Sequence, residues 1–299
     1  MSADNHTAAN SPRQPIARLA GVCGWPVHHS LSPFLHGLWL AALREQGTDI
    51  HGAYTMFAVH PMEANRAFRS LKQTSISGVN VTIPLKSQAF AAADEQTPEA
   101  IKLGVCNVLY KRGDILVGHN TDMEGFAEPL LKQIGPHQLM NMSVTLVGTG
   151  GAARAALGAL LSLGAPEIRL IGRDDEKVRA LVARINTPNL FAWSWADRDE
   201  IVAGSGLVIN ATSAGMKTNP ALDIDISTMR PGSWVYDLVY TPIQTPLLKA
   251  AEAAGLNTIS GLDMLIAQAR PSFKLFFGHE APFIPELRDR LSARLEAGL

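Results

Sequence analysis

Short apolar runs alternate with segments of helical periodicity along the first third of the chain. The runs Leu19–Gly24, Tyr54–Val59 and Gly78–Ile83 are rich in branched and aromatic residues, which is typical of β-strands. Between them, Ser32–Glu45 and Met62–Leu71 place apolar residues at helical spacing, which predicts two amphipathic helices. Strands that alternate with helices in this way indicate a parallel sheet covered by helices.

A hairpin and a further helix follow. The runs Cys106–Tyr110 and Ile115–Gly118 flank a short polar link that contains glycine, and this pattern predicts a β-hairpin. From Met123 to Ile134 the apolar positions return to helical spacing, which predicts a helix. We expect Gly135–Met142 to be a loop.

The second half of the chain alternates strands and helices again. The predicted strands are Ser143–Val147, Glu167–Ile171, Leu207–Asn210 and Trp234–Leu238. The predicted helices are Gly151–Leu163, Asp175–Ile185, Thr245–Ala254, Leu262–Phe276 and Ile284–Ala297. The whole pattern predicts an α/β protein with two α/β domains and a cleft between them. The last helix would either cover an edge strand or contribute to a homodimer contact.

Composition narrows the class of protein. Of 299 residues, 46% are hydrophobic and 18% are charged, as in a globular protein long enough for two domains. The formal net charge of −1 argues against a nucleic-acid partner. No run approaches the roughly 18–20 apolar residues that a membrane span needs, so we expect no membrane partner. The polar residues 1–15 predict a disordered tail and not a signal peptide, hence a cytoplasmic protein. Cys23 and Cys106 stand in apolar contexts and predict buried, reduced thiols.

A glycine-rich loop joins the strand Ser143–Val147 to the helix after it. The loop fits the pattern G-x-G-x-x-G/A between a strand and a helix, which is typical of a dinucleotide site. Gly148 would allow the tight turn, and Gly150 would let the backbone approach a pyrophosphate at the helix N-terminus. A glycine turn used only for packing is the alternative. The residues expected to hold the cofactor are Gly148, Thr149, Gly150, Gly151 and Ala152.

Charged residues follow the next strand, which ends at Ile171. An acidic side chain there, such as Asp174, would bind the ribose hydroxyls of NAD and repel a 2′-phosphate. Arg173 and Lys177 would instead clamp the 2′-phosphate of NADP. Because three acidic residues outnumber two basic ones, we favour NAD and keep NADP as the alternative. Asp174 or Asp175 would also suit the N-cap of the following helix.

Polar residues gather in four segments of the first domain. These segments are Gly24–Pro33, Asn80–Lys86, Asn107 and His119–Asp122. Alternation along the strand points Asn80 and Thr82 to the same face. Lys86 follows in the first turn of the next helix, where a cation opposes the helix dipole. Each side chain alone also fits a structural role, such as a helix cap, a turn or an exposed charge. Together their hydroxyls, amides, ammonium and carboxylate suit a small polyhydroxylated substrate.

Oxidation of a secondary alcohol by hydride transfer needs a group that takes up the hydroxyl proton. Lys86 and Asp122 together could take up this proton. The alternative bases are His28, His29 and His119. Because none of these histidines stands at a recognisable metal-ligand spacing from an acidic residue, we expect no metal.

In these segments the chain resembles the shikimate dehydrogenase family, including its quinate/shikimate branch, from Leu19 to the last helices. The segments that carry the resemblance are Gly24–Pro33, Asn80–Lys86, Gly118–Asp122, Gly148–Ala152, Asn210–Gly215, Tyr236–Tyr240 and Gly261–Ala269. The resemblance implies an enzyme that interconverts 3-dehydroshikimate and shikimate by hydride transfer with a nicotinamide cofactor. Its place would be the chorismate pathway of aromatic amino acid biosynthesis, or quinate catabolism.

The resemblance also implies domains and roles. Residues 16–121 would form a substrate-binding domain, completed by helices in 263–299, and residues 122–262 a Rossmann dinucleotide-binding domain. Lys86 would be the catalytic acid/base, with Asp122 holding the reacting hydroxyl and orienting the lysine. The substrate-binding residues would be Ser30, Ser32, Thr82, Asn107, Tyr240 and Gln268. Leu238 and Gly261 would lie near the nicotinamide, and we assign Asn80 to structural support.

Some positions depart from the family pattern. Gly172-Arg173-Asp174 stands where NADP-using members carry Asn-Arg-Thr, which favours NAD. Asp263 replaces a common glycine near the nicotinamide end, and Trp25 replaces a small polar residue and would reshape the substrate mouth. Ser32, in place of a threonine frequent in quinate-preferring members, favours shikimate. A quinate or aminoshikimate-type dehydrogenase, or a non-catalytic nucleotide-binding regulator on the same fold, remain as alternatives.

Overall fold

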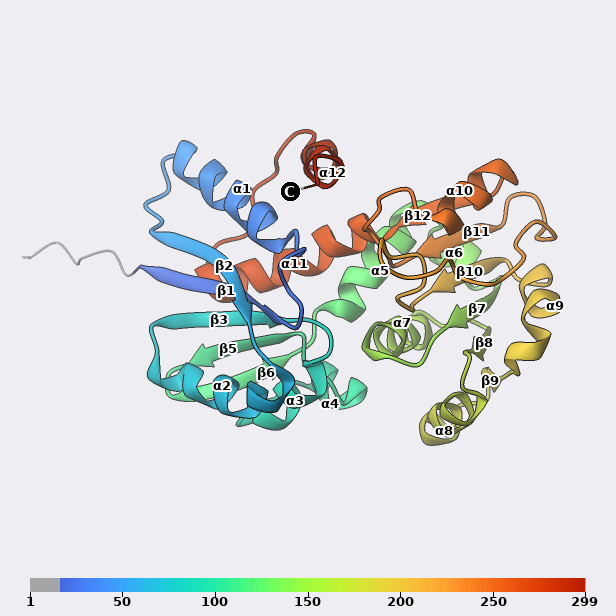
Figure 1. The fold of residues 1–299 in the computed structure, drawn as a ribbon, viewed down its shortest axis with the longest axis horizontal. Helices are drawn as coiled ribbons and strands as arrows, with labels where there is room; N and C mark the ends of the chain where they lie inside the picture. The colour runs from blue at the N-terminus through green and yellow to red at the C-terminus, as the bar shows by residue number, and fades with distance from the viewer. Residues whose placement is uncertain (1–16, 299) are drawn as a thin grey trace, which may run out of the picture.

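Two six-stranded sheets, joined by long helices, make up the computed structural model, which describes residues 17–298 (Figure 1). The first sheet has the strand order β2-β1-β3-β5-β6-β4, and the second has the order β12-β11-β10-β7-β8-β9. The expected α/β class with two domains is therefore confirmed. The tail predicted for residues 1–15 lies outside the described residues.

The first sheet is mixed. Its strands are β1 (Arg18–Gly24), β2 (Gly52–Ala58), β3 (Ile76–Val81), β4 (Glu95–Gln96), β5 (Val108–Arg112) and β6 (Ile115–His119). Strand β1 pairs in parallel with β2 and β3, and the antiparallel pair β5–β6 is the predicted hairpin. Helix α1 (Ser32–Glu45) lies on one face, and α2 (Ala64–Ser70), α3 (Lys86–Ala92) and α4 (Pro98–Leu103) lie on the other (Figure 1). Because β1 and β3 are parallel, their carboxyl ends, followed by polar residues, meet at one edge.

The second sheet is parallel throughout. Its strands are β7 (Ser143–Val147), β8 (Glu167–Ile171), β9 (Leu190–Ala192), β10 (Leu207–Asn210), β11 (Trp234–Asp237) and β12 (Asn257–Ser260). Its helices are α5 (Asp122–Gln133), α6 (Pro136–Leu139), α7 (Gly151–Ser162), α8 (Asp175–Ile185), α9 (Arg198–Ala203) and α10 (Pro246–Ala253). The strand order reverses beside β7, and open α/β sheets bind ligands at the carboxyl ends of strands at such a switch point.

Helix α11 (Gly261–Phe277) returns the chain from the second sheet to the first (Figure 1). It begins directly after β12 and packs against β1, β3 and β5 with buried phenylalanines, among them Phe273 and Phe276. The last helix, α12 (Leu287–Glu296), buries Leu291 in the apolar cluster that contains Phe273 and Phe276. The C-terminal helices therefore pack on the first sheet.

Helices α5 and α11 cross closely at Gly125. A Cβ atom at Gly125 would lie 2.4 Å from the Cβ of Gln268 and 2.8 Å from its backbone nitrogen. The two domains also touch through a small apolar cluster in which Leu103 and Val105 contact Ala155. Both contacts bring elements of the first domain against helices of the second.

Most predicted elements are present, and the differences concern short ones. The segment Gly135–Met142, predicted as a loop, contains the one-turn helix α6, so that prediction was wrong. The segment Met62–Leu71 is α2 flanked by 3-10 turns at Pro61–Glu63 and Leu71–Gln73. The elements not predicted are β4, β9, β12, α4 and α9. Each has six residues or fewer, which is too short for hydrophobic periodicity to reveal.

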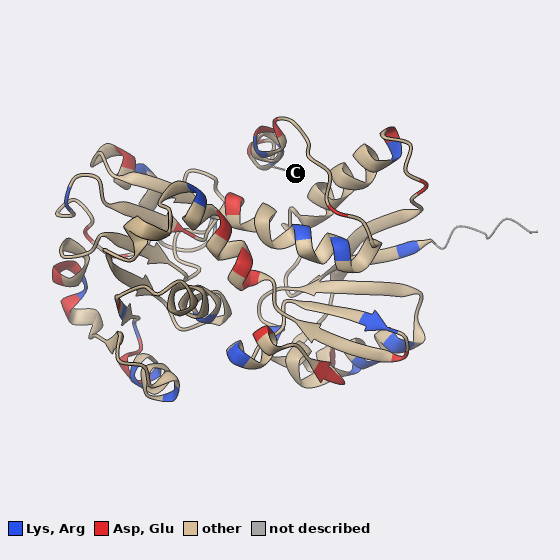
Figure 2. Cartoon of the chain, turned by 180° about the vertical axis from the view of Figure 1, so that it is seen from behind, with Lys and Arg blue, Asp and Glu red and all other residues tan. Residues whose placement is uncertain are grey.

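The structure also bears on the expectations about the cysteines, the charged residues and a membrane span. Cys23 and Cys106 are free and buried, as predicted, and burial raises the pKa of each thiol to about 12. Lys, Arg, Asp and Glu are interspersed over both domains (Figure 2). Within residues 17–298, none of the helices is long and apolar enough to cross a bilayer.

Candidate active site

Lys86 and Asp122 form an ion pair where the two domains meet. The Nζ of Lys86 lies 2.5 Å from Oδ2 of Asp122, and the two side chains are only 17% and 7% exposed. Lys86 is the first residue of α3 and Asp122 the first of α5. A Cβ atom at Gly151, the first residue of α7, would lie 3.4 Å from the Cδ of Lys86. The pair therefore stands beside the glycine-rich loop.

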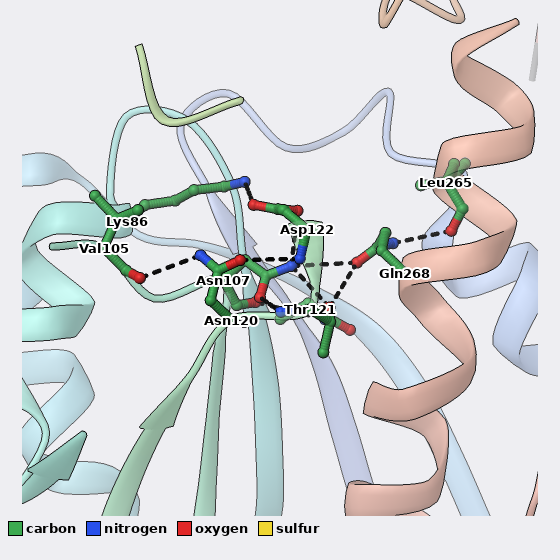
Figure 3. A network of polar contacts seen from close by, with 9 residues as sticks. Lys86, Val105, Asn107, Asn120, Thr121, Asp122, Leu265 and Gln268 are labelled. Carbon is green, nitrogen blue, oxygen red and sulfur yellow. Dashed lines mark hydrogen bonds and ion pairs between the residues drawn. The ribbon is translucent and has the colours of Figure 1, made fainter. Parts of the chain in front are cut away.

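A hydrogen-bond network holds the carboxylate of Asp122 (Figure 3). Asn107 Nδ2 donates to Asp122 Oδ1 at 2.8 Å and to Thr121 Oγ1 at 2.9 Å. The Thr121 amide donates to Asn107 Oδ1 at 2.8 Å, and the Asp122 amide donates to Asn120 Oδ1 at 2.9 Å. Since Lys86 engages the other carboxylate oxygen, Asp122 has a fixed orientation.

Helix α11 adds Gln268 to this network (Figure 3). Its Oε1 lies 3.3 Å from Asn107 Nδ2 and 3.4 Å from Thr121 Oγ1, while its Nε2 donates to the Leu265 carbonyl at 3.0 Å. The close crossing at Gly125 makes this contact possible. Of the expected site residues, Lys86, Asn107, Asp122 and Gln268 are thus joined directly.

The other expected substrate residues lie at strand ends. Ser30 and the buried Ser32 stand at the start of α1, where Ser30 Oγ accepts from the Ser32 amide at 3.4 Å. Thr82 follows β3, and its methyl group packs against Gly24 at the end of β1. Tyr240 follows β11; burial raises the pKa of its hydroxyl, and a hydrogen bond with the Leu31 backbone lowers it. Tyr240 therefore reaches from the second domain to the start of α1.

Within residues 17–298, no hydrogen bond or ion pair joins the alternative bases to the side chains of Lys86 and Asp122. His119 Nδ1 lies 2.9 Å from Thr97 Oγ1 and 3.7 Å from a Glu99 oxygen; burial lowers its pKa and Glu99 raises it. His28 and His29 contact each other edge to face, with ring centroids 5.1 Å apart. In residues 17–298, no group of three or more His, Cys, Asp or Glu side chains could hold a metal ion.

The glycine-rich loop has the geometry of an anion site. Gly148 has φ +119°, which only glycine adopts readily, and its Cβ position would lie 3.0 Å from the Ala211 carbonyl. Gly150 is the N-cap residue of α7, and no atom lies within 4 Å of its Cβ position in the described chain. The first turn of α7 has no acidic residue, so its amide groups can take an anion.

Leu238 and Gly261 meet beyond the ends of β11 and β12. A Cβ atom at Gly261 would lie 2.3 Å from the Leu238 carbonyl oxygen, so only glycine allows this approach. A buried carboxylate supports the same region. Asp237 accepts hydrogen bonds from Thr245 Oγ1 at 2.6 Å, Asn210 Nδ2 at 2.9 Å and the Val239 amide at 3.0 Å. Burial nevertheless raises the pKa of Asp237 to about 6.

The acidic residues after β8 are engaged within the protein. Asp174 caps α8 by accepting from the Lys177 amide at 3.1 Å, and it pairs with Lys177 Nζ at 2.8 Å. These contacts with Lys177 lower the pKa of Asp174. Asp175 accepts from Ser194 and from the Trp195 amide. Two of the three acidic residues that favoured NAD, and Lys177 with them, are therefore engaged within the protein, whereas Arg173 is exposed.

Asp263 and Trp25, which depart from the family pattern, also contact other side chains. Asp263, in the first turn of α11, lies 3.1 Å from Arg288 Nε of α12, so it binds the last helix to α11. Trp25 is 46% exposed and contacts His60 edge to face at 5.1 Å. With Met56 it lines an apolar hollow beside the loop after β1. Its effect on the substrate mouth stays a prediction.

Three family models match the chain. The shikimate dehydrogenase substrate binding domain matches residues 22–109, the shikimate / quinate 5-dehydrogenase matches 129–224, and the shikimate 5′-dehydrogenase C-terminal domain matches 261–284. The shikimate dehydrogenase (NADP(+)) of Rhodospirillum rubrum is 41% identical over 286 residues, covering 93% of this chain and 96% of the relative.

Solved structures are similar over the same length. Shikimate 5-dehydrogenase of Thermus thermophilus, in complex with NADP(H) and shikimate, superimposes with a TM-score of 0.78 at 30% identity. That match covers 93% of this chain and 99% of the other. Quinate dehydrogenase of Corynebacterium glutamicum, in complex with NAD, gives a TM-score of 0.79 at 27% identity, covering 95% and 99%.

Proposed function

Since the chain belongs to the shikimate dehydrogenase family, we propose that it is a shikimate dehydrogenase, which interconverts shikimate and 3-dehydroshikimate by hydride transfer with NADP(H). The observation that carries this proposal is the Lys86–Asp122 pair beside the glycine-rich loop. A regulator that only binds a nucleotide has no need of a buried lysine and carboxylate at this position.

Lys86 acts as acid and base in the proposed reaction. The bound nicotinamide cofactor supplies the hydride acceptor or donor. During reduction, the Lys86 ammonium gives a proton to the substrate carbonyl oxygen, and during oxidation the neutral Lys86 amine takes up the proton of the reacting hydroxyl. Asp122 accepts a hydrogen bond from the same hydroxyl and orients the lysine. Its own orientation is fixed by Asn107 and Asn120.

The surrounding polar groups bind the substrate. Ser30 and Ser32, with the backbone at the start of α1, suit the substrate carboxylate, because hydroxyl and amide donors at a helix N-terminus favour an anion. The ring hydroxyls would meet Thr82, Asn107, Tyr240 and Gln268. This placement is supported by where these residues lie: at the start of α1, after β3 and β11, directly before β5, and on α11.

We infer that NADP is the preferred cofactor. The relatives named for NADP(+) do not support the preference for NAD that the residue count favoured. Arg173 is exposed after β8 and would take the 2′-phosphate, since Asp174 already caps α8 and pairs with Lys177. Gly148–Ala152 would hold the pyrophosphate, with Leu238 and Gly261 beside the nicotinamide.

The domain assignment and cellular context belong to the same proposal. We assign substrate binding to residues 16–121 with 263–299, and dinucleotide binding to residues 122–262. A role in aromatic amino acid biosynthesis, a cytoplasmic location and a homodimer stay predictions. So does the absence of nucleic-acid and membrane partners.

Initial rates of cofactor reduction test the proposal. Shikimate and quinate are each offered with NADP and with NAD. We expect the highest kcat/KM with shikimate and NADP. Faster turnover of quinate would instead point to a quinate dehydrogenase, and faster reduction of NAD would contradict the role given to Arg173. No activity in any of the four combinations would contradict the function.

A further inference from the structure

Tyr54 on β2 stands at one end of a hydrogen-bond chain that leads to the Lys86–Asp122 pair. The Tyr54 hydroxyl donates to Asn80 Oδ1 at 2.7 Å, and Asn80 Nδ2 reaches the Asn107 carbonyl at 3.5 Å. The Asn107 side chain then donates to Asp122 at 2.8 Å, and Asp122 pairs with Lys86 at 2.5 Å. Neither the family resemblance nor the polar segments of the sequence assigned a role to Tyr54.

Small residues make room for the Tyr54 ring across the sheet. Tyr54 lies in register with Ala20 on β1, and Ala20 lies in register with Gly78 on β3. Asn80 comes two residues after Gly78 and so projects from the same face of β3. The ring can therefore extend from the edge strand β2 over β1 toward Asn80.

His36 fixes the ring from one side. The two rings stack with centroids 3.9 Å apart and planes 11° from parallel. His36 is fully buried, burial lowers its pKa to about 3, and neither ring nitrogen has a hydrogen-bond partner within residues 17–298. The imidazole is therefore neutral and acts as a packing surface. Trp39 and Phe273 enclose it, each with its ring centroid within 6 Å.

The direction of the Tyr54 hydrogen bond determines the orientation of Asn80. A phenol has one hydrogen, and here it goes to the Asn80 carbonyl oxygen. The Asn80 amino group must then face the other way, toward Asn107 and the site. Burial raises the pKa of Tyr54 well above the ordinary value, although a hydrogen bond with the Ser32 side chain lowers it, so the phenol keeps its hydrogen.

We propose that Tyr54 is a positioning residue for the substrate, whose hydroxyl holds the Asn80 side chain with its amino group toward Asn107, the residue that binds the substrate's hydroxyl groups. The inference rests on the proposed function, because it concerns the same site. Tyr54 contacts neither Lys86 nor the glycine-rich loop, and Asp122 keeps its own ion pair with Lys86, so we expect the Tyr54 hydroxyl to affect substrate affinity more than proton transfer or cofactor binding.

The test compares the wild type with Tyr54→Phe and with Tyr110→Phe. Tyr110, on β5, packs against the same apolar cluster and serves as the matched control. In Tyr54→Phe the Asn80 amide is free to turn over and present its oxygen to the Asn107 carbonyl, which repels it and displaces Asn107. We expect the KM for shikimate to rise about tenfold, as for one lost hydrogen bond, while kcat and the KM for NADP change less than twofold. Tyr110→Phe should match the wild type in all three.

Two results would overturn the inference while the proposed function stands: an unchanged KM for shikimate in Tyr54→Phe, or a fall in kcat at unchanged KM. A wild type without shikimate activity would instead remove the proposed function, and the inference with it. If Tyr54→Phe does not fold, Asn80→Asp takes its place. That variant keeps an acceptor for Tyr54 but replaces the amino group with oxygen, so we expect at least a tenfold higher KM for shikimate. An unchanged KM in Asn80→Asp would equally overturn the inference.

Discussion

Lys86 Nζ lies 2.5 Å from Asp122 Oδ2, and each of these residues is the first of its helix. The positive end of the α5 dipole favours the carboxylate of Asp122, whereas that of α3 disfavours the ammonium of Lys86. The ion pair offsets this unfavourable position, and it keeps a lysine at a helix N-terminus where its proton can reach a substrate. The remaining Asp122 oxygen is held by Asn107, so the carboxylate cannot rotate away.

Gly125→Ala should separate the two helices that carry the site. The added methyl group would meet Gln268 at 2.4–2.8 Å, including backbone atoms, so α11 must move away from α5. We expect a shikimate KM raised at least fivefold and a free energy of unfolding lowered by about 1–3 kcal/mol, as for overpacked cores. Steady-state kinetics and urea denaturation measure both effects.

Gly37→Ala is the matched control for this crossing. Gly37 lies inside α1, and no atom lies within 4 Å of its Cβ position in the described chain. There the methyl group should stabilise the protein by up to about 1 kcal/mol through helix propensity and leave KM unchanged. If both variants behave alike, the tight crossing of α5 and α11 has no role in substrate binding.

Arg173→Ala should weaken NADP selectively. Loss of the guanidinium removes a charge-assisted contact with the 2′-phosphate, so we expect the KM for NADP to rise about tenfold and the KM for NAD to stay within twofold. Arg179→Ala, an exposed arginine on α8, serves as the control. An equal rise of both KM values in Arg173→Ala would show that Arg173 does not bind the 2′-phosphate.

Asp237 should make stability depend on pH between about 4 and 6. Its pKa is about 6 in the folded protein because of burial, against 3.8 as the ordinary value. In this window the folded state holds a proton that the unfolded chain has released, so the contribution of Asp237 to stability falls as pH rises, by at most about 3 kcal/mol.

Urea denaturation of the wild type and of Asp237→Asn from pH 4.5 to 7.5 tests the predicted pH dependence of stability. The stability of the wild type relative to the variant should decrease up to about pH 6 and then level off. Asp225→Asn is the control, because the Ser227 hydrogen bonds lower the pKa of this exposed carboxylate and place its titration below the window. A constant difference between the wild type and Asp237→Asn would contradict the raised pKa.

Local sequence patterns predicted those site residues that lie at the ends of clearly patterned strands. Strand alternation places Asn80 and Thr82 on one face, and the glycine pattern located the turn at Gly148 because that signal lies within a few residues. Lys86 was conspicuous because a cation at a helix N-terminus is unfavourable.

Contacts across the fold could not be predicted from local pattern. Gln268 lies 3.3 Å from Asn107 although 161 positions separate them, and only the family resemblance indicated it. Tyr54 stands in an apolar strand, where an aromatic residue is expected in the core, and nothing nearby reveals its partner on another strand. The N-cap role predicted for Asp174 or Asp175 needs only local pattern, and the hydrogen bond from the Lys177 amide to Asp174 confirms it.

The kinetics of Lys86→Met test the central claim most directly. We expect kcat for shikimate oxidation with NADP to fall by about 10²–10⁴, the usual contribution of general acid–base catalysis. Shikimate and NADP should still bind, as calorimetric titration would show. Lys72→Met is the control, since Lys72 forms an exposed ion pair with Asp94 at 3.0 Å, and it should keep full activity. A Lys86→Met enzyme with more than a tenth of the wild-type kcat would contradict the acid–base role of Lys86.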